Sequence, residues 1–222
     1  FHANGWTFTW INTARGMTNV CLRKVEPQLI FELIKNENIT MFCAAPTVLI
    51  SIANAPEVMR ENVPRGVRLF TAGAPPAAAT IEMIERDLGW DLTHVYGLTE
   101  TAPLITFCEQ RPEHKNLSLS DRSKIKARQG VELVTSGELK VVDDEGIEVP
   151  KNAETLGEIA VRGNVVMSGY YNDKEATNAA IRDGWFYSGD AAVVHPDGYV
   201  EIRDRFKDVI ISGGENISSV EV

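Results

Sequence analysis

The feature that most constrains the fold is an alternation of helix-like and strand-like segments over residues 25–96. Apolar residues at helical spacing cover 25–39, 46–54 and 77–88, and short apolar runs typical of buried strands cover 40–45, 67–71 and 91–96. Strands that alternate with helices are joined by crossovers, so they lie parallel and the helices cover the sheet. We therefore expect an α/β fold whose first half contains a parallel, helix-covered sheet.

From about residue 130 the pattern changes to short β-type runs separated by turn-forming residues. The runs cover 137–142, 157–162, 184–187 and 198–202, and the turn formers lie at 143–146 and 196–198. This spacing predicts a small antiparallel sheet or open barrel. Along the chain we expect an α/β part over 1–108, a connection over 109–129, a β-rich part over 130–204 and a terminal segment over 205–222.

Composition excludes several classes of protein. The 222 residues include 22 basic and 31 acidic side chains, a formal net charge of −9, whereas a sequence-independent nucleic-acid binder needs clustered Lys and Arg. No window approaches the roughly 18 uninterrupted apolar residues of a transmembrane helix. Cys21, Cys43 and Cys108 are odd in number, lie in apolar surroundings and form no CxxC pair. They predict buried, reduced thiols and a cytoplasmic location.

The segment Tyr96–Thr101 carries the clearest chemical signal. It follows the last predicted parallel strand, at the edge where open α/β sheets bind ligands. Gly97 permits close approach of a ligand, and the Thr99 hydroxyl can bond a phosphate oxygen. Glu100 can hold Mg²⁺, which often takes one or two protein carboxylates together with substrate phosphates. Taken alone, the segment fits a strand-to-helix turn with Thr99 as the N-cap equally well.

Further sequence blocks lie before and after this segment. They are Phe1–Trp6, Gly73–Pro76, Gly163–Asn172, Gly184–Asp190, Asp204–Asp208 and Ser212–Asn216. In this order and spacing the chain resembles the adenylate-forming superfamily of acyl-CoA synthetases, adenylation domains and luciferases. The resemblance runs from the first residue to the last, and it implies the C-terminal half of that superfamily's large N-terminal domain. The stretch Asn19–Lys24 is similar to the medium-chain and plant-peroxisomal-like branch of fatty acyl-CoA synthetases.

The resemblance implies a nucleotide site made of residues from both halves of the chain. The residues bordering the adenine would be Gly73, Ala74, Pro75 and the backbone near Val95, with Tyr96 stacking on the base and Gly97 beside it. Thr99 would contact the α-phosphate and Glu100 would hold Mg²⁺. Without the resemblance, Gly73–Pro76 would be an ordinary turn before a helix.

Asp190 and Arg205 complete this implied nucleotide site. Asp190 would accept hydrogen bonds from both ribose hydroxyls, because a carboxylate offers two acceptor oxygens. Arg205 would bond the ribose or a phosphate through its fork of donors. Without the resemblance, Asp190 would belong to a turn, and Arg205 would form a surface ion pair with Asp204 or Asp208.

The remaining implied roles concern the acid, the hinge and coenzyme A. His2 would gate the carboxylate site and Trp6 would wall the acyl pocket. Gly97 would leave room for a longer acyl chain than acetate. Lys207 would be the hinge before a C-terminal domain. The loop approaching the pantetheine arm of coenzyme A would be formed by Ser212, Gly213 and Gly214, which are equally typical of a plain β-turn.

We therefore expect part of an acyl-CoA synthetase that uses ATP, Mg²⁺ and coenzyme A, forms an acyl-adenylate and releases AMP and pyrophosphate. A medium-chain fatty acid is the expected substrate, and a homodimer of the whole enzyme is possible. The chain begins at the aromatic block and ends at the hinge, so we expect a fragment. It has no counterpart of the family's phosphate loop or of its catalytic Lys, so we expect almost no activity from these 222 residues alone.

Three alternatives stay open from the residues. The first is a ligase for another acid: an aryl acid, a thioether-bearing propionate or an amino acid. The apolar stretch Phe42–Pro46 carries no Asp that could hold an ammonium group, which argues against an amino acid. The second is a truncated module that binds nucleotide without catalysis, and the third is an α/β domain with no nucleotide site.

Overall fold

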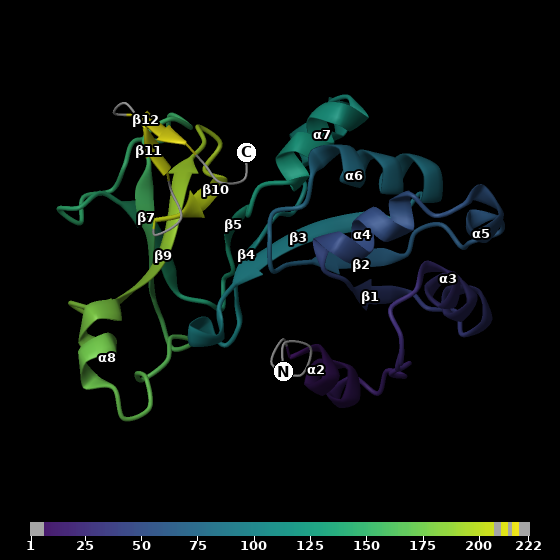
Figure 1. Cartoon of the computed structure of the whole chain (residues 1–222), viewed down its shortest axis with the longest axis horizontal. Helices are drawn as coiled ribbons and strands as arrows, with labels where there is room; N and C mark the ends of the chain where they lie inside the picture. Colours follow the sequence, from purple (N-terminus) through teal and green to yellow (C-terminus); the bar gives the residue numbers. More distant parts are fainter. Residues whose placement is uncertain (1–6, 207–209, 213–214, 218–222) are drawn as a thin grey trace. The chain divides into compact units, whose positions relative to one another are not determined.

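The computed structural model describes residues 7–206, and of 210–212 and 215–217 it describes the backbone. The chain divides into two compact units, one formed by residues 1–96 with 108–127 and the other by residues 97–107 with 128–222. Figure 1 shows the elements of both units. Among the residues that are described, no helix is long and apolar enough to cross a membrane.

The first unit is an α/β layer arrangement. Its elements are α2 (Phe8–Ala14), α3 (Pro27–Asn36), β1 (Met41–Cys43), α4 (Pro46–Ala53), α5 (Glu57–Arg60), β2 (Arg68–Thr71), α6 (Ala78–Met83), the π-helical turn η1 (Ile84–Leu88), β3 (Asp91–Gly97), the 3-10 turn η3 (Pro112–Asn116) and α7 (Leu119–Lys126). Strands β1, β2 and β3 lie in this order and are parallel. The predicted parallel, helix-covered sheet is confirmed.

One face of this sheet carries the main core of the unit. Leu69 of β2 and Leu92 of β3 are partners in the strand register and are fully buried. The buried residues that pack with them from α3, α4, α6 and η1 are Ile30, Phe31, Ile34, Leu49, Ile52, Ala53, Ile81, Ile84 and Leu88. Trp90 is buried in the same cluster, edge-on to Phe42 at 5.5 Å, and its indole N–H donates to the Pro64 carbonyl at 3.0 Å.

The opposite face is covered differently. Successive strand residues point to opposite faces, so Phe70, next to Leu69, contacts Phe8 of α2 with ring centroids 5.5 Å apart. Cys43 is the register partner of Phe70 and is exposed, as is Cys21. The prediction of three buried thiols is therefore wrong for these two. In β1, Phe42 packs against the core, and the next residue, Cys43, points to the other face. Cys108 alone is buried, and its thiol donates to the Ile125 carbonyl at 3.1 Å.

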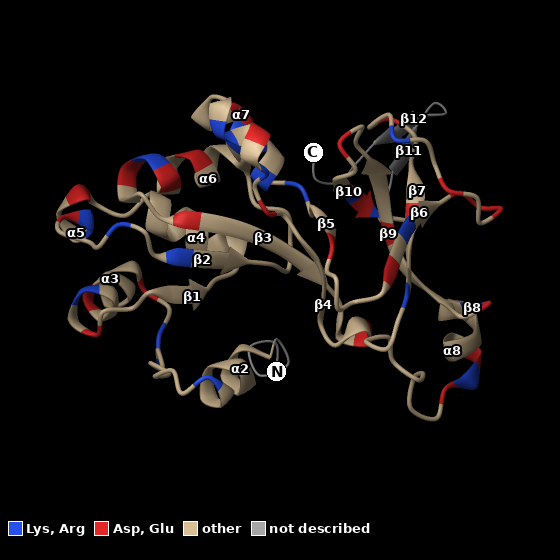
Figure 2. Cartoon of the chain, turned by 180° about the vertical axis from the view of Figure 1, so that it is seen from behind, with Lys and Arg blue, Asp and Glu red and all other residues tan. Residues whose placement is uncertain are grey.

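The stretch 109–129, which the sequence indicated only as a polar connection, contains helix α7. Ser118 caps it by accepting a hydrogen bond from the Asp121 N–H at 3.1 Å. Helix α7 carries mostly polar and charged side chains (Figure 2), and Lys126 at its end is buried against the two carboxylates of Glu85 and Asp91. The helix therefore docks through a charge pairing rather than through an apolar stripe, which is why hydrophobic periodicity missed it.

The second unit is antiparallel. Its elements are the 3-10 turn η2 (Thr99–Thr101), β4 (Leu104–Phe107), β5 (Val131–Glu132), β6 (Glu138–Val142), β7 (Gly157–Arg162), α8 (Lys174–Ala180), β8 (Ile181–Arg182), β9 (Trp185–Val194), β10 (Val200–Arg205), β11 (Ile210–Ser212) and β12 (Glu215–Ile217). Strands β10, β9, β7 and β6 lie in this order, and β8 pairs with β9. The predicted antiparallel sheet is confirmed, with β9 running well beyond the expected 184–187.

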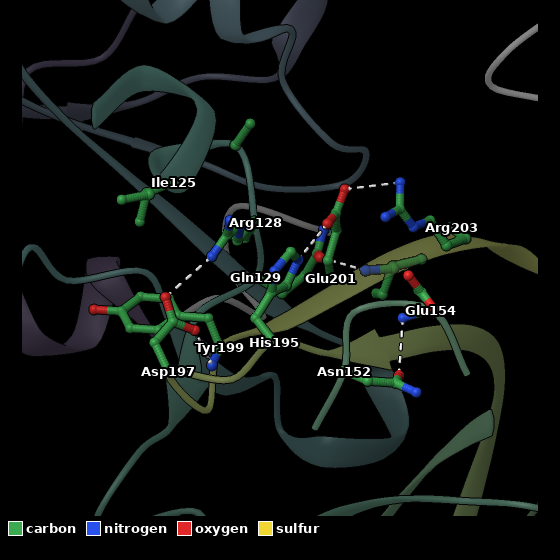
Figure 3. Close-up of polar contacts among 12 residues, drawn as sticks. Ile125, Arg128, Gln129, Asn152, Glu154, His195, Asp197, Tyr199, Glu201 and Arg203 are labelled. Atoms are coloured by element: carbon green, nitrogen blue, oxygen red, sulfur yellow. Dashed lines mark hydrogen bonds and ion pairs between the residues drawn. The ribbon is translucent and has the colours of Figure 1, made fainter. Parts of the chain in front are cut away.

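Polar contacts hold the β9–β10 hairpin in register. Figure 3 shows His195 facing Glu201, whose carboxylate also pairs with Arg203 at 3.2 Å. Arg128 pairs with Asp197 in the connecting turn at 3.1 Å. The side-chain amide oxygen Oε1 of Gln129 accepts the Ile202 N–H at 2.6 Å. The backbone pairing of β9 with β10 sets the register, in which Asp190 lies opposite Arg205.

Candidate functional site

Asp190 and Arg205 are brought together by the register of β9 and β10, in which they are direct partners. Asp190 is 5% exposed, and its Oδ1 lies 3.4 Å from Nε of Arg205. The Arg205 side chain is 57% exposed, so a ligand can reach it. Asp204, one of the suggested surface partners, accepts the backbone N–H of Arg205 at 2.8 Å. Asp208 lies outside the described residues.

The backbone on both sides of Asp190 is fixed. Gly189 has a φ of +78°, a conformation that residues with a side chain rarely adopt. Its N–H donates to Glu158 Oε1 at 2.8 Å, and its carbonyl accepts the Phe206 N–H at 3.0 Å. Asp190 is thus a buried acceptor on a bent, hydrogen-bonded strand rather than part of a loose turn.

The segment after β3 folds back on itself. The Leu98 N–H donates to Thr101 Oγ1 at 3.0 Å. The Thr101 hydroxyl, which is buried, in turn donates to the Pro103 carbonyl oxygen at 2.9 Å. Leu98, not Thr99, occupies the N-cap position of the short turn η2. Thr99 is the exposed first residue of η2, so its hydroxyl is accessible to a phosphate.

Gly97, which was predicted to leave room for an acyl chain, lies against the chain's own backbone. A Cβ at Gly97 would lie 1.7 Å from the Pro103 carbonyl oxygen and 2.8 Å from the Leu104 Cα. The glycine is therefore required by the close approach of the chain's own backbone. Its role in an acyl pocket stays a prediction.

Glu100 is held by two hydrogen bonds from the segment that precedes α8. The Tyr170 hydroxyl donates to Glu100 Oε1 at 3.0 Å, and the Met167 N–H donates to the Glu100 carbonyl at 2.8 Å. Burial, and then the hydrogen bond to this carboxylate, raise the pKa of Tyr170 above its ordinary value. The phenol therefore remains a proton donor to Glu100 throughout the neutral pH range.

The other carboxylate oxygen of Glu100 is available for a cation. Oε2 has no hydrogen-bond or ion-pair partner among the residues described, and the carboxylate is half-buried. No group of three or more His, Cys, Asp or Glu that could hold a metal occurs in the described part of the chain. A single carboxylate oxygen fits Mg²⁺ that takes its remaining ligands from phosphates and water.

In the first unit, two predicted segments lie at the carboxyl ends of neighbouring parallel strands. Gly73, Ala74 and Pro75 are exposed and follow β2, while Val95 and Tyr96 lie near the end of β3. Thr71 and His94 are register partners, so the two segments leave the sheet side by side. Val95 is fully buried and Tyr96 is half-buried.

Several predicted site residues lie outside the described part of the chain: His2, Trp6, Lys207, Gly213 and Gly214. Ser212 ends β11, and only its backbone is described. Conversely, Tyr170 contacts Glu100 although the sequence assigned it no role. The signal was its position in the block Gly163–Asn172, which the resemblance had already singled out.

The chain is similar to several known proteins. Residues 1–171 match the family described as AMP-binding enzyme. Over its whole length the chain is 50% identical to "Probable acyl-activating enzyme 5, peroxisomal" of Arabidopsis thaliana. It is 48% identical, again over its whole length, to a 2-methylpropanoate–CoA ligase of Humulus lupulus. The chain spans 40% of the length of each of these curated relatives.

Solved structures show the same fold. The O-succinylbenzoate coenzyme A synthetase of Bacillus subtilis in complex with AMP superposes with a TM-score of 0.78 at 28% sequence identity, over 99% of this chain and 42% of the other. The same enzyme in complex with ATP and a magnesium ion gives a TM-score of 0.77 over the same shares of both chains. The expected fold class is therefore confirmed.

Proposed function

The chain belongs to the AMP-binding enzyme family, and on that premise we propose that the complete gene product is an acid–thiol ligase, an acyl-CoA synthetase that forms AMP. In the first step a carboxylate oxygen attacks the α-phosphorus of ATP, and pyrophosphate leaves as the acyl-adenylate forms. In the second step the thiol of coenzyme A attacks the acyl carbonyl, AMP leaves, and the thiol proton is released. Relatives named as CoA ligases support this activity.

The observation that carries the proposal is the pairing of Asp190 with Arg205. The resemblance assigns both residues to one nucleotide, and they are strand partners although fifteen positions separate them in the chain. A buried carboxylate can accept two ribose hydroxyl hydrogens, while the exposed guanidinium can bond ribose or phosphate oxygens. Each such charged hydrogen bond is worth about 1.5–3 kcal/mol.

The phosphate end of ATP is assigned to Thr99 and Glu100. The exposed Thr99 hydroxyl can donate to an α-phosphate oxygen, and Glu100 would hold Mg²⁺ through its available oxygen. When bound, Mg²⁺ supplies positive charge that lowers the cost of the charge developing on the leaving pyrophosphate. Gly73–Pro75 and Tyr96, at neighbouring strand ends, are proposed to border the adenine.

The remaining assignments rest on the resemblance. Lys207 is proposed as the hinge, Ser212, Gly213 and Gly214 as the coenzyme A loop, and His2 and Trp6 as parts of the acid site. A medium-chain fatty acid is the proposed substrate, supported by the sequence branch and by the apolar stretch Phe42–Pro46. The 222 residues alone are proposed to be nearly inactive, because they contain no counterpart of the family's phosphate loop or catalytic Lys.

The proposed compartment is the cytoplasm, although one relative is named as peroxisomal. A peroxisomal location would suit the same substrates, so microscopy of the tagged complete gene product decides between the two. A homodimer of the complete gene product is likewise proposed.

The activity is tested by acid-dependent exchange of labelled pyrophosphate into ATP, followed by detection of the acyl-CoA thioester. We expect kcat/KM to be highest for hexanoate or octanoate, lower for 2-methylpropanoate and palmitate, and lowest for acetate and benzoate. The complete gene product is assayed with Mg²⁺, and omission of the acid is the blank.

Each other outcome contradicts a defined part of the proposal. A preference for benzoate would overturn the fatty-acyl assignment while leaving the ligase activity intact. Nucleotide binding without exchange for any acid would overturn the ligase activity and favour a nucleotide-binding module.

A further inference from the structure

Tyr170 makes the one side-chain hydrogen bond that the described residues give to the Glu100 carboxylate. Its hydroxyl contacts Oε1 at 3.0 Å, whereas Oε2 has no described partner. A carboxylate on a flexible side chain can rotate, so a donor on one oxygen fixes the direction in which the other points. Groups that hold a metal ligand in this way are part of the working site although they do not touch the metal.

The backbone of Tyr170 is hydrogen-bonded to a residue of α8. Its backbone N–H donates to Thr177 Oγ1 at 2.9 Å, and that hydroxyl donates to the Asp173 carbonyl at 2.6 Å. Asp173 also caps α8, because its carboxylate accepts the Ala176 N–H at 2.9 Å. The start of a helix therefore positions the backbone from which Tyr170 reaches Glu100.

Gly169 makes this arrangement possible. Its φ is +150°, and a Cβ there would lie 2.8 Å from the Thr177 side chain. The chain thus passes against Thr177 just before Tyr170. A second tie, from the Met167 N–H to the Glu100 carbonyl at 2.8 Å, joins the same segment to η2 independently of the phenol.

From these contacts we propose that Tyr170 is a positioning residue for Glu100: the α8–Thr177–Tyr170 series holds the carboxylate so that its second oxygen faces Mg²⁺–nucleotide. This inference rests on the proposed function, because it needs Glu100 to take part in metal binding. The Met167 bond keeps the backbone of η2 in place, so removal of the phenol hydroxyl frees the carboxylate without unfolding the turn.

The test measures Mn²⁺ binding to the ATP complex of the complete gene product by electron paramagnetic resonance, with no turnover required. We expect Tyr170→Phe to weaken Mn²⁺ binding by roughly ten-fold, the size typical for removal of a group that orients a metal ligand. The matched control is Tyr171→Phe, because Tyr171 is adjacent, 93% exposed and has no described contact with Glu100. It should bind Mn²⁺ as the unchanged protein does.

A double-variant cycle separates positioning from a general structural effect. Glu100→Gln should weaken Mn²⁺ binding, and adding Tyr170→Phe to it should cause no further loss, since the phenol acts through the carboxylate. Thr177→Val should give a smaller loss in the same direction. It also serves as the test if Tyr170→Phe does not fold.

The outcomes distinguish the two claims. If Glu100→Gln leaves Mn²⁺ binding unchanged, the proposed metal role of Glu100 fails and the positioning role fails with it. If Glu100→Gln weakens binding but Tyr170→Phe does not, only the positioning role is overturned. Additive losses in the double variant would also overturn it.

Discussion

The turns that follow β2 and β3 are held in opposite ways. Gly73, Ala74 and Pro75 are exposed and make no hydrogen bond to any residue in the described ranges. The turn after β3 is closed by the Thr101 hydroxyl and tied by Met167 and Tyr170. The part of the site proposed to face metal and phosphate is thus fixed before any ligand binds. The part proposed to face the adenine is free to adjust to it.

Each of the two turns begins with a glycine, Gly73 after β2 and Gly97 at the end of β3, and substitutions of these glycines can measure how differently the turns are constrained. At Gly97 a side chain is excluded by neighbouring backbone, whereas at Gly73 nothing lies within 4 Å of a Cβ and only the φ of +96° disfavours one. The first constraint belongs to the packing of the second unit. The second is local to one residue.

The largest expected effect is that of Gly97→Ala. The added methyl group would collide with the Pro103 carbonyl. Because this neighbour is backbone and not the end of a flexible side chain, the turn itself must shift to relieve the clash. We expect the free energy of unfolding of the second unit to fall by about 3 kcal/mol, at the upper end for overpacking. Urea denaturation of the complete gene product measures this loss.

A smaller effect is expected for Gly73→Ala. With open space around the Cβ, the cost is the strain of a positive φ, about 1–2 kcal/mol. The same urea titration checks it and provides the matched comparison with Gly97→Ala. A loss at Gly73 that equals or exceeds the loss at Gly97 would show that the two turns are constrained alike.

The parallel sheet could be predicted because its signals are local. Helical spacing in 25–39 and the apolar run 40–45 gave α3 and β1 within a few residues of their observed bounds. Strand β9 was predicted too short: the expected run ended at 187, and without the resemblance Asp190 was assigned to a turn. The strand continues through Ser188 and Gly189, since Ala191–Val194 are buried between β7 and β10.

Other features depend on contacts that sequence spacing does not reveal. Helix α7 docks through the buried Lys126, whose partner Glu85 is forty-one positions away. A capping pattern at Ser118 and Asp121 was the available signal, and Asp173 gave the same kind of signal for α8. The close contact at Gly97 was not predicted, because the Pro103 carbonyl that lies against it comes from a turn six residues later in the chain.

The resemblance predicted which residues belong to the candidate site. The fold adds which of these residues contact one another. Asp190 and Arg205 are partners because the β9–β10 register sets them opposite one another. The link from Tyr170 to Glu100 spans seventy positions and could not be derived from either block alone.

The central claim is that the buried Asp190 carboxylate binds the nucleotide, and calorimetric titration of ATP and Mg²⁺ into the complete gene product tests it directly. Asp190→Asn should weaken ATP binding by roughly ten-fold or more, because a charged acceptor for ribose hydroxyls is lost. The control is Asp197→Asn, which removes a carboxylate paired with Arg128 in the same unit and should leave ATP affinity unchanged. Equal ATP affinity in Asp190→Asn and the unchanged protein would contradict the account.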